Sequence, residues 1–378
     1  MVNFEFQDQG LLMLILFVIF ASSLGVQLFF HWIIFGKLAF YKAGGKVLTA
    51  PPVSVIISAR NEYLNLQENL PFVLEQDYPD YEVVVVNDAS DDDTGELLKD
   101  FSLKYPHLKV IQFAKNLNFF TGKKFPLSLG IKSAAHDVLL FTDADCKPSS
   151  NQWIRRMASG FHDARDIVLG YGPYERKKGL LNILIRYDTF HVAVQYLSFA
   201  LSGLTYMGVG RNLAYRKSLF YKLKGFTSHY KVASGDDDLF INRAANSKNT
   251  AIEISREGQT TSKQARRFSD FIRQKKRHLT TAKYYRWKFK ILLTAYALSQ
   301  YFFWGLFFSL ICLKFNVLYL LIMMGVKLIS QLIITKNCLN KLKEEKLLLI
   351  SPLIELLFVI LNPLIAISNL IYKKDKWK

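Results

Sequence analysis

Two aspartates separated by a single residue stand near the middle of the chain, directly after an apolar run. The stretch "VLLFTDADCKP" (138–148) places Asp143 and Asp145 where a β-strand is expected to end. Two carboxylates a few ångströms apart repel by roughly 1 kcal/mol in water and by about 4 kcal/mol at an effective dielectric constant of 20. A divalent cation removes that repulsion. Mg²⁺ binds one or two carboxylates together with the phosphate oxygens of a substrate, and Mn²⁺ accepts the same oxygen ligands. The pair therefore predicts a Mg²⁺ or Mn²⁺ site that holds a diphosphate.

A second acidic cluster lies in "KVASGDDDLFINRAAN" (231–246), where Asp236, Asp237 and Asp238 follow a glycine and precede an amphipathic helical pattern. The dipole of a helix N-terminus accounts for one or two acids at such a place. Three consecutive carboxylates repel one another, so we expect at least one of them to be functional. A metal offsets the charge on a departing diphosphate, and an aspartate can accept the proton of an attacking hydroxyl. The two clusters together suggest a nucleotide-activated donor.

The segments that must position these acids alternate between strands and helices. Continuous apolar runs predict buried strands, and the segments between them predict helices. The strands are expected at 53–58, 81–88, 108–113 and 137–145, and the helices at about 62–75, 91–104 and 123–134. This alternation predicts an α/β fold with a doubly wound, mostly parallel sheet, in which ligands bind at the carboxyl ends of the strands. Polar residues gather at those ends: Arg60, Asn61, Glu62, Asn87, Asp88, Asp143 and Asp145.

Apolar tracts of membrane-span length flank this region. Residues 11–30 carry no charge, and at 1.5 Å per residue they span roughly the 30 Å of a bilayer's hydrocarbon core. Acidic residues precede this tract, and Lys37, Lys42 and Lys46 follow it. The positive-inside rule therefore puts the N-terminus outside. We expect an integral protein of the cytoplasmic (inner) membrane whose α/β domain faces the cytoplasm.

Two to three further transmembrane helices are predicted after the α/β region, in tracts at 291–313, about 315–335 and about 347–372. The last two tracts each contain one interior charge, Lys327 and Glu355. A lone charge at mid-membrane costs about 2.5–3.5 kcal/mol, so we hypothesise that these two residues pair; a position of one of them near an interface is the alternative. Prolines interrupt the last tract, which either spans the membrane or forms a re-entrant hairpin that returns the basic tail 373–378 to the cytoplasm.

Composition and charge complete this division of the chain. The net charge is +18, and residues 263–290 hold eleven Lys or Arg and one acid, interleaved with aromatic residues. This pattern is typical of a helix on an anionic membrane surface. Single-stranded nucleic acid selects a similar pattern, but an expected span begins directly afterwards. We therefore expect membrane lipids, and no nucleic acid, as partners; an oligomer is compatible with the sequence.

The expected parts are an N-terminal anchor (1–46), a cytoplasmic domain (47–260), a basic interfacial region (261–290) and a C-terminal transmembrane region (291–378).

Six stretches, in the same order along the chain, resemble the inverting family 2 glycosyltransferases with a GT-A fold, in their membrane-integrated form. They are "VSVIISARNE", "VVVNDASDDDT", "TGKKFPLSLGI", "TDAD", "GVGRNLAYR" and "SGDDDLF", and they fall within about residues 50–290. The resemblance implies an enzyme that moves a sugar from a nucleotide-sugar, with a UDP-sugar expected, to a lipid or glycan acceptor.

The resemblance also implies roles for particular residues. Nucleotide-sugar contacts are expected from Ala59, Arg60, Asn61, Glu62, Asp88, Lys123 and Asp143, metal ligation from Asp143 and Asp145, and the acceptor side from Gly210, Arg211 and Asn212. The catalytic base depends on the register of the last stretch. Anchoring it on the glycine selects Asp237 and anchoring it on the leucine selects Asp236; we favour Asp237.

One stretch departs from the family's pattern. In "RQKKRHLTT" (273–281), Gln274 and Arg277 match a Gln-any-any-Arg-Trp motif, but His278 replaces the tryptophan. Arg277 can still pair with a diphosphate through its planar guanidinium. The lost aromatic platform favours a lipid or single-sugar acceptor over a processive polysaccharide synthase, which is the nearest rival hypothesis. A non-catalytic nucleotide-binding membrane scaffold is a further hypothesis, against which the intact acidic set argues. A nucleotidyltransferase is another, but it would bind a nucleoside triphosphate and would need neither the basic region nor an acceptor segment.

Overall fold

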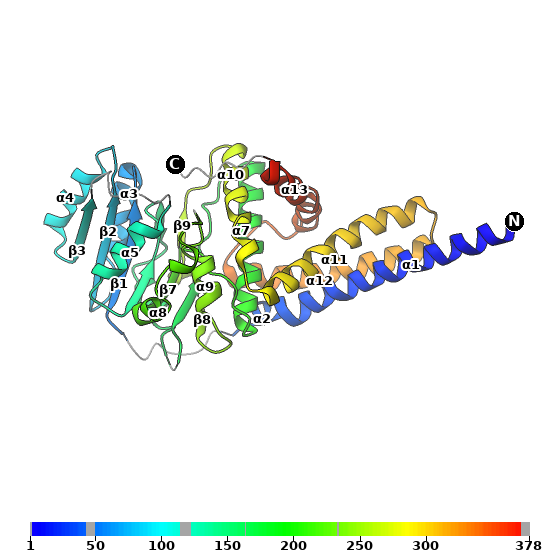
Figure 1. Cartoon of the computed structure of the whole chain (residues 1–378), viewed down its shortest axis with the longest axis horizontal. Helices are drawn as coiled ribbons and strands as arrows, with labels where there is room; N and C mark the ends of the chain where they lie inside the picture. The colour runs from blue at the N-terminus through cyan, green and yellow to red at the C-terminus, as the bar shows by residue number, and fades with distance from the viewer. Residues whose placement is uncertain (1, 43–49, 114–121, 163, 233, 372–378) are drawn as a thin grey trace. The chain divides into compact units, whose positions relative to one another are not determined.

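The computed structural model of the chain describes residues 2–42, 50–113, 122–162, 164–232 and 234–371. It divides into two compact units, each described separately below (Figure 1). One unit joins Met1–Tyr41 to Arg286–Ser368, and the other holds Lys42–Tyr285 with the end of the chain. Lys46 and the basic tail 373–378, which enter the expected topology, lie outside the described residues.

The second unit is built on a seven-stranded, mostly parallel sheet in the order β3-β2-β1-β4-β7-β6-β8. β1, β2, β3 and β4 run parallel, β7 runs antiparallel to both β4 and β6, and β8 is parallel to β6. The predicted fold class and the first three predicted strands are confirmed. The strands are β1 (Val53–Ala59), β2 (Tyr81–Asp88), β3 (Leu108–Phe113), β4 (Val138–Phe141), β6 (Ile167–Gly170), β7 (Leu213–Arg216) and β8 (Thr250–Glu253), with β5 (Cys146–Pro148) and β9 (Thr260–Ser262) forming a separate antiparallel pair.

The fourth strand is shorter than the sequence predicts. We expected it to run to residue 145, but β4 ends at Phe141, the last residue in register with β1 and β7. Beyond it the backbone N–H of Cys146 donates to the carbonyl of Asp143 at 3.0 Å, which closes a turn, and the chain continues into β5. If the strand continued, Asp143 and Asp145 would point to the same face of the sheet, because successive side chains of a strand alternate between its two faces. The turn instead places both aspartates in a loop beyond the sheet edge.

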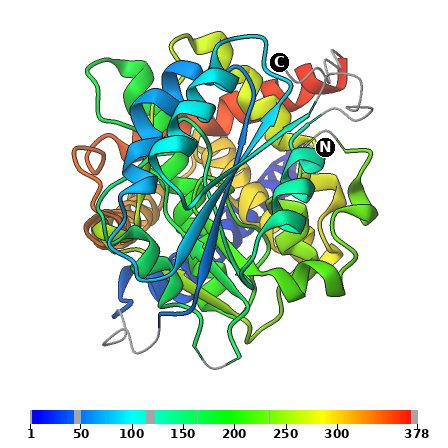
Figure 2. The ribbon, with the colours of Figure 1, turned by 90° about the vertical axis from the view of Figure 1, so that its left-hand side faces the viewer.

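Helices cover both faces of the sheet, as Figure 2 shows. On one face α3 (Tyr63–Leu74), α4 (Thr94–Lys104) and α6 (Trp153–Ala158) pack through leucines, a tryptophan and a methionine onto the valines of β1 and β2. On the other face α5 (Lys124–Ser133) approaches β1 and β2 closely, because a Cβ at Gly130 would come within 2.8 Å of Ile56 Cγ2. The three predicted helices are confirmed, although α4 begins only at Thr94, after Asp92 accepts a hydrogen bond from the Thr94 N–H.

The remaining helices of this unit lie towards the C-terminal half of its sequence. One of them, α7, is a single 22-residue helix, and the basic region contains α10. These elements are α7 (Leu180–Leu201), α8 (Lys217–Lys222), α9 (Asp238–Ala244) and α10 (Phe268–Leu279), with short 3₁₀ turns at Thr227–His229, Arg256–Gly258 and Ala282–Tyr284.

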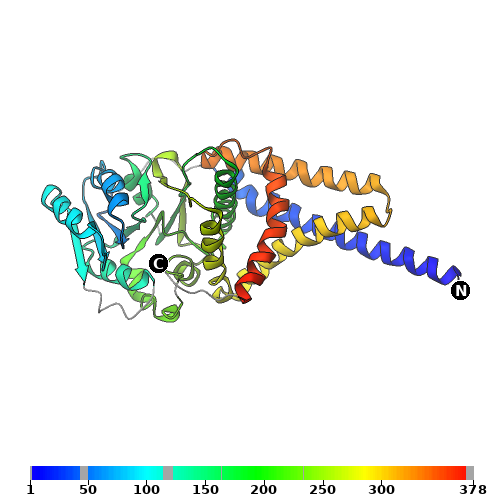
Figure 3. The same ribbon diagram turned by 90° about the horizontal axis from the view of Figure 1, so that it is seen from above.

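The first unit consists of apolar helices. Four described stretches are long and apolar enough to cross a membrane: Gly10–Ala39, Trp287–Cys312, Val317–Leu342 and Ser351–Asn369. The first comprises α1 (Val2–Phe29), a π-helical segment (Phe30–Phe35) and α2 (Gly36–Ala39); the others are α11 (Trp287–Cys312), α12 (Val317–Leu342) and α13 (Ser351–Ile371). α13 is one continuous helix that contains Pro363, so its described residues form no hairpin. Its axis runs across those of α1, α11 and α12 (Figure 3).

A buried ion pair joins two of these helices. Lys327 Nζ lies 2.6 Å from Glu355 Oε1, and both side chains are buried, Lys327 completely. Gln331 Nε2 donates to the other carboxylate oxygen at 2.7 Å and Trp304 Nε1 donates at 3.2 Å. The hypothesised pairing of the two interior charges is therefore confirmed, and the pair is completed by the neutral donors that a charge in an apolar setting requires.

Removing one member of this pair should be worse than removing both. We expect Lys327→Met or Glu355→Gln alone to lower the free energy of unfolding by about 3–5 kcal/mol, because each leaves a buried charge without its partner. The double variant K327M/E355Q should recover most of that loss. Unfolding of the full chain in detergent measures this, with the exposed Lys336→Met on α12 as the matched control. A double variant no more stable than either single one contradicts the coupling.

Backbone strain is found next to the sheet edge. Ala89, directly after β2, has φ 48° while its N–H donates to the carbonyl of Asn87 at 3.0 Å. The left-handed region costs a residue with a Cβ roughly 1–2 kcal/mol. Such outliers persist where the surrounding structure imposes them, and they cluster at functional sites.

Glycine at this position should relieve the strain. We expect Ala89→Gly to stabilise the chain by about 0.5–1 kcal/mol, since the gain at positive φ exceeds the added entropy of the unfolded chain. Ala134→Gly, at a residue with φ −61°, is the control and should be destabilising. The midpoint of thermal unfolding of the full chain distinguishes the two, and an equal loss in both variants would show that Ala89 is not strained.

Candidate active site

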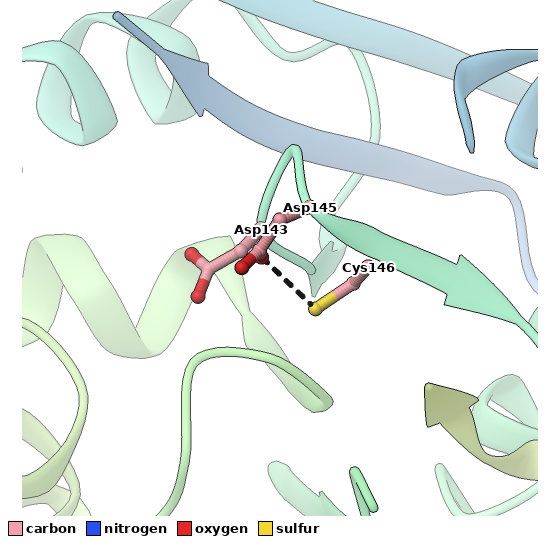
Figure 4. A group of neighbouring side chains, drawn as sticks. All are labelled: Asp143, Asp145 and Cys146. Carbon is pink, nitrogen blue, oxygen red and sulfur yellow. Dashed lines mark hydrogen bonds between the residues drawn. The ribbon is translucent and has the colours of Figure 1, made fainter. Parts of the chain in front are cut away.

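The turn after β4 brings two carboxylates and a thiol together. Ligand atoms of Asp143, Asp145 and Cys146 all lie within 4.8 Å of one another. Figure 4 draws these three side chains together at the turn. The Cys146 thiol donates to Asp145 Oδ1 at 3.5 Å. Burial, together with the two neighbouring acids, raises the pKa of the Cys146 thiol well above its usual value. The sulfur is therefore a protonated thiol, a weak ligand, and the two carboxylates are the groups suited to a hard cation.

A lysine supplies the first positive charge to this pair. Lys123, at the N-terminal boundary of α5, places its Nζ 2.6 Å from Asp143 Oδ1. Burial opposes the ionisation of Asp143, but the Lys123 ammonium outweighs it and lowers the pKa of that carboxyl. Asp145 differs, because burial and the charge on Asp143 raise its pKa. One ammonium thus leaves part of the repulsion uncompensated, and the site fits a divalent cation.

The second acidic cluster lies against the first. Asp236 and Asp237 line a pocket together with Asp143 and Gly210, and its remaining walls are Ser58, Leu127, Phe141, Thr142, Leu213 and Tyr215. Burial, reinforced by the neighbouring acid, raises the pKa of Asp236 to about 6 and that of Asp237 to about 6. The structure therefore brings the predicted metal ligand and both candidate bases into one pocket.

The three consecutive aspartates have different partners. Asp237 caps α9 by accepting the Asp238 N–H at 2.7 Å, and its other oxygen accepts the Gly210 N–H at 2.9 Å. Asp238 is 7% exposed and accepts hydrogen bonds from the hydroxyls of Tyr285, at 2.7 Å, and Thr281. Within the described part of the chain, no other residue donates a hydrogen bond to the Asp236 carboxylate. Asp236 thus has the least committed carboxylate of the three.

The ends of β1 and β2 are joined to each other by side chains. The Asn61 N–H donates to Ser90 Oγ at 2.9 Å, and the Glu62 N–H donates to Thr94 Oγ1 at 3.0 Å. Asn61 has φ 55°, a conformation that asparagine tolerates. Burial raises the pKa of Glu62, with a smaller contribution from the charge on Asp145, so the end of β1 lies within electrostatic range of the metal turn.

The remaining predicted contacts at this edge differ in exposure. Ala59 and Asp88 are buried, at 1% and 4% exposed, whereas the Arg60 side chain is exposed. Of these three, Arg60 is the side chain that a ligand can reach in this conformation.

Residues from the loop before β7 and from α10 complete the surroundings. The Arg211 guanidinium lies 4.3 Å from the centroid of the Tyr174 ring, and the Tyr174 hydroxyl accepts from Gln274 Nε2 at 3.0 Å. Arg211 and Arg277 both act electrostatically on Asp143 and favour its charged form. Gln274 and Arg277 of α10 are thereby brought to the metal turn.

Asn212 has a different role from the acceptor contact that the sequence predicts. Its side chain is 1% exposed; it accepts from Trp153 Nε1 at 3.0 Å and donates to the carbonyls of Tyr171 and Gly258 at 3.0 and 2.8 Å. These bonds hold β6, α6 and the loop before β9 together, so the amide acts within the fold.

Sequence reasoning missed two side chains at this site. Tyr174 carries no motif, and only its contact with Arg211 reveals it. Lys124 stands beside Lys123 in the stretch "TGKKFPLSLGI", but its partners are backbone carbonyls far along the chain, which leave no residue-type signal.

Comparisons with known proteins agree with this geometry. Residues 54–224 match the model for glycosyl transferase family 2. Glycosyltransferase AglE of Haloferax volcanii is 36% identical over 145 residues, which cover 38% of this chain and 46% of AglE. Poly-β-1,6-N-acetyl-D-glucosamine synthase of Staphylococcus epidermidis is 33% identical over 93 residues, which cover 25% of this chain and 21% of the synthase. The chain spans less than half the length of these curated relatives.

A solved structure supports the same fold over most of the chain. The mannosyltransferase PcManGT of Pyrobaculum calidifontis, in complex with GDP-Man and Mn²⁺, superposes with a TM-score of 0.58 over 88% of this chain and 98% of PcManGT, at 17% sequence identity. This likeness establishes a shared architecture. The family match over residues 54–224, the GT-A-like sheet and the four apolar helices of membrane-span length make the chain similar to the membrane-integrated family 2 glycosyltransferases.

Proposed function

We propose that the chain transfers a sugar from a nucleotide-sugar to an acceptor at the membrane surface, with inversion at the anomeric carbon. The observation that carries this proposal is the pocket that Asp143, Asp236 and Asp237 share at the carboxyl edge of the parallel strands. Ligands of doubly wound sheets bind at that edge. A metal-binding acid and an uncommitted acid in one pocket provide the two functions that a displacement at a sugar carbon needs.

On the donor side, Asp143 and Asp145 would hold Mg²⁺ or Mn²⁺, which offsets the charge on the departing diphosphate. Lys123 would share its ammonium between Asp143 and the diphosphate. The exposed strand-end residues Arg60 and Asn61 would contact the nucleoside. PcManGT, which has the same fold, holds GDP-Man with Mn²⁺. The sequence predicts a UDP-sugar. Assays with UDP-sugars and GDP-sugars decide between uridine and guanosine.

On the acceptor side, we assign the base to Asp236 and give Asp237 the role of holding the loop. Both Asp237 oxygens already accept backbone N–H groups, whereas Asp236 is free to accept a proton. The acceptor oxygen bonds to the anomeric carbon as the bond from that carbon to the diphosphate breaks, and the hydroxyl proton passes to Asp236. One in-line displacement inverts the configuration.

The positive side chains near the metal turn would stabilise the leaving group. Arg277 and Arg211 both lower the electrostatic energy of an anion beside Asp143, and Gln274 links to Arg211 through Tyr174. An arginine suits a diphosphate because its donors are fixed in a plane. Gly210 would contribute through the backbone N–H that already holds Asp237.

A lipid or glycan acceptor follows from the setting of the site. The chain has apolar helices of membrane-span length, and α10 carries Arg273 and Lys276 together with the exposed Phe268. Basic and aromatic side chains on one helix favour an anionic lipid surface. Lys37 lies in the last turn of the first apolar stretch and Lys42 follows it, so we assign the catalytic unit to the cytoplasmic face.

A processive synthase that extends a polysaccharide is the second candidate, because the relative from Staphylococcus epidermidis is named as a polymer synthase. Membranes that contain the chain, incubated with labelled nucleotide-sugars, separate the two. Label that is soluble in organic solvent supports the lipid acceptor, and label in high-mass polymer supports the synthase. Nucleotide-sugar binding without turnover would instead support a non-catalytic scaffold.

Metal removal should abolish transfer. We expect the purified chain, tested with a panel of UDP- and GDP-sugars, to release nucleoside diphosphate with Mg²⁺ or Mn²⁺ and to lose at least about 100-fold of that rate in excess chelator, since the leaving charge is then unshielded. Asp143→Asn and Asp145→Asn should fall by a similar factor in the presence of metal. The exposed Asp100→Asn on α4 is the control. Full activity in chelator would exclude the metal site.

The rate should fall in acid because the base must be deprotonated. With its pKa raised to about 6, Asp236 loses its proton above that pH, so log kcat should rise by about one per pH unit below 6 and level off above it. Asp236→Asn should remove this limb and lower kcat by at least about 1000-fold. Asp237→Asn should retain more activity than Asp236→Asn. If Asp236→Asn retains more activity than Asp237→Asn, the base is Asp237, as the alignment of this stretch on the glycine predicts.

A further inference from the structure

Lys124, next to the donor-site lysine, is buried, and no carboxylate of the described residues forms an ion pair with it. Its side chain is 3% exposed, and its ammonium donates to three backbone carbonyls: His229 at 3.0 Å, Ser234 at 2.7 Å and Val232. A lysine ammonium has three donors, so these carbonyls satisfy it completely. Lysine is seldom fully buried unless it is paired. The chain therefore commits a buried charge to a set of neutral acceptors.

The three carbonyls all belong to the segment that leads into the acidic cluster. Val232 and Ser234 lie outside every described helix and strand, so their carbonyls have no ladder to join, whereas the His229 carbonyl also accepts the Val232 N–H at 3.1 Å. Buried carbonyls without a partner are costly. Lys124 gathers three carbonyls at one point, directly before Gly235 and Asp236. Burial lowers the pKa of the Lys124 ammonium, and the nearby charges of Asp236, Asp238 and Asp237 oppose that effect by favouring its charged form.

Gly235 shows how tightly this segment is held. Its φ is +97°, and a Cβ there would come within 2.5 Å of Leu239 Cδ1. The backbone before Asp236 can take this path only with glycine, and Lys124 fixes the carbonyl on the other side of it. The place of the acidic cluster is thus set by contacts on both flanks, Lys124 before it and the Asp238 hydrogen bonds to Thr281 and Tyr285 after it.

We propose that Lys124 is a positioning residue for the catalytic base: its ammonium holds the carbonyls of His229, Val232 and Ser234 so that Asp236 faces the pocket that it shares with Asp143. This rests on the proposed function. Two consecutive lysines at the start of α5 then serve the two halves of the reaction. Lys123 acts on the donor side through Asp143, and Lys124 acts on the acceptor side through the loop.

The proposal predicts a split between kcat and the donor KM. Lys124→Met keeps the length and apolar stem of the side chain but removes all three donors. We expect kcat to fall at least about tenfold while the donor KM and metal requirement stay within about twofold, because the donor residues are untouched. Lys124→Arg should recover part of kcat, since a guanidinium can donate to several carbonyls. Lys132→Met, an exposed lysine on the same helix, is the control and should match the parent chain.

Amide hydrogen exchange of the full chain in detergent gives a readout that does not depend on activity. In Lys124→Met the amides of 229–238 should exchange faster, and those of α5 should be unchanged. The acidic limb of the pH profile of kcat should move to higher pH in Lys124→Met. Asp236 keeps the neighbouring charges of Asp237, Lys123 and Asp143, but it loses the positive charge of Lys124, which favours its ionised form.

Each outcome bears on the proposal separately from the proposed function. If the parent chain transfers no sugar, the proposed function fails, and faster exchange at 229–238 would still support the role of Lys124 in holding the loop. Unchanged exchange and unchanged kcat in Lys124→Met would overturn the proposal. A loss confined to donor KM would assign Lys124 to the donor side and overturn it as well. Failure of both Lys124→Met and Lys124→Arg to fold would make Lys124 a residue of the fold and would likewise overturn it.

Discussion

The crowding of carboxylates into one pocket is the constraint on which the catalytic unit depends. Asp143, Asp236 and Asp237 line that pocket, and Asp145 lies in the same turn as Asp143. Charges of one sign in surroundings less polar than water repel far more strongly than they do in solvent. Lys123 offsets the charge on Asp143. Burial, reinforced by a neighbouring carboxylate, still raises the pKa values of Asp145 and Asp236. The excess of negative charge in this pocket makes the binding of a cation and the uptake of a proton favourable.

The topology of the sheet makes this crowding unavoidable. β1, β2 and β4 are parallel, so their carboxyl ends reach the same edge. β7 lies beside β4 and runs in the opposite direction. The loop before β7 and the loop after β4 therefore lie at the same edge of the sheet. The hydrogen bond from Thr142 Oγ1 to the carbonyl of Arg211, at 3.0 Å, joins these two loops. One antiparallel strand in a parallel sheet thereby brings an acceptor-side loop against the metal turn.

The sequence predicted what is local and missed what depends on distant partners. Uninterrupted apolar runs are sufficient to locate β1, β2 and β3, because a strand buried on both faces has no polar positions. The pairing of Lys327 with Glu355 was also predictable, since a charge in an apolar helix has few other solutions. The end of β4 was not, because a single turn bond at Asp143 decides it.

The division of roles within the aspartate triplet could not be read from the sequence either. Residue type is the same at all three positions, and their differences come from partners elsewhere in the chain: Gly210, Thr281 and Tyr285. A carboxylate that must accept a proton near neutral pH needs partial burial to raise its pKa and few donors to lower it again. Partial burial of an unbonded acid on an irregular loop is stable only if the loop is held by other contacts. The capping bonds of Asp237, the hydroxyls around Asp238 and the ammonium of Lys124 provide those contacts. They hold the loop in place while the Asp236 carboxylate stays available to accept a proton.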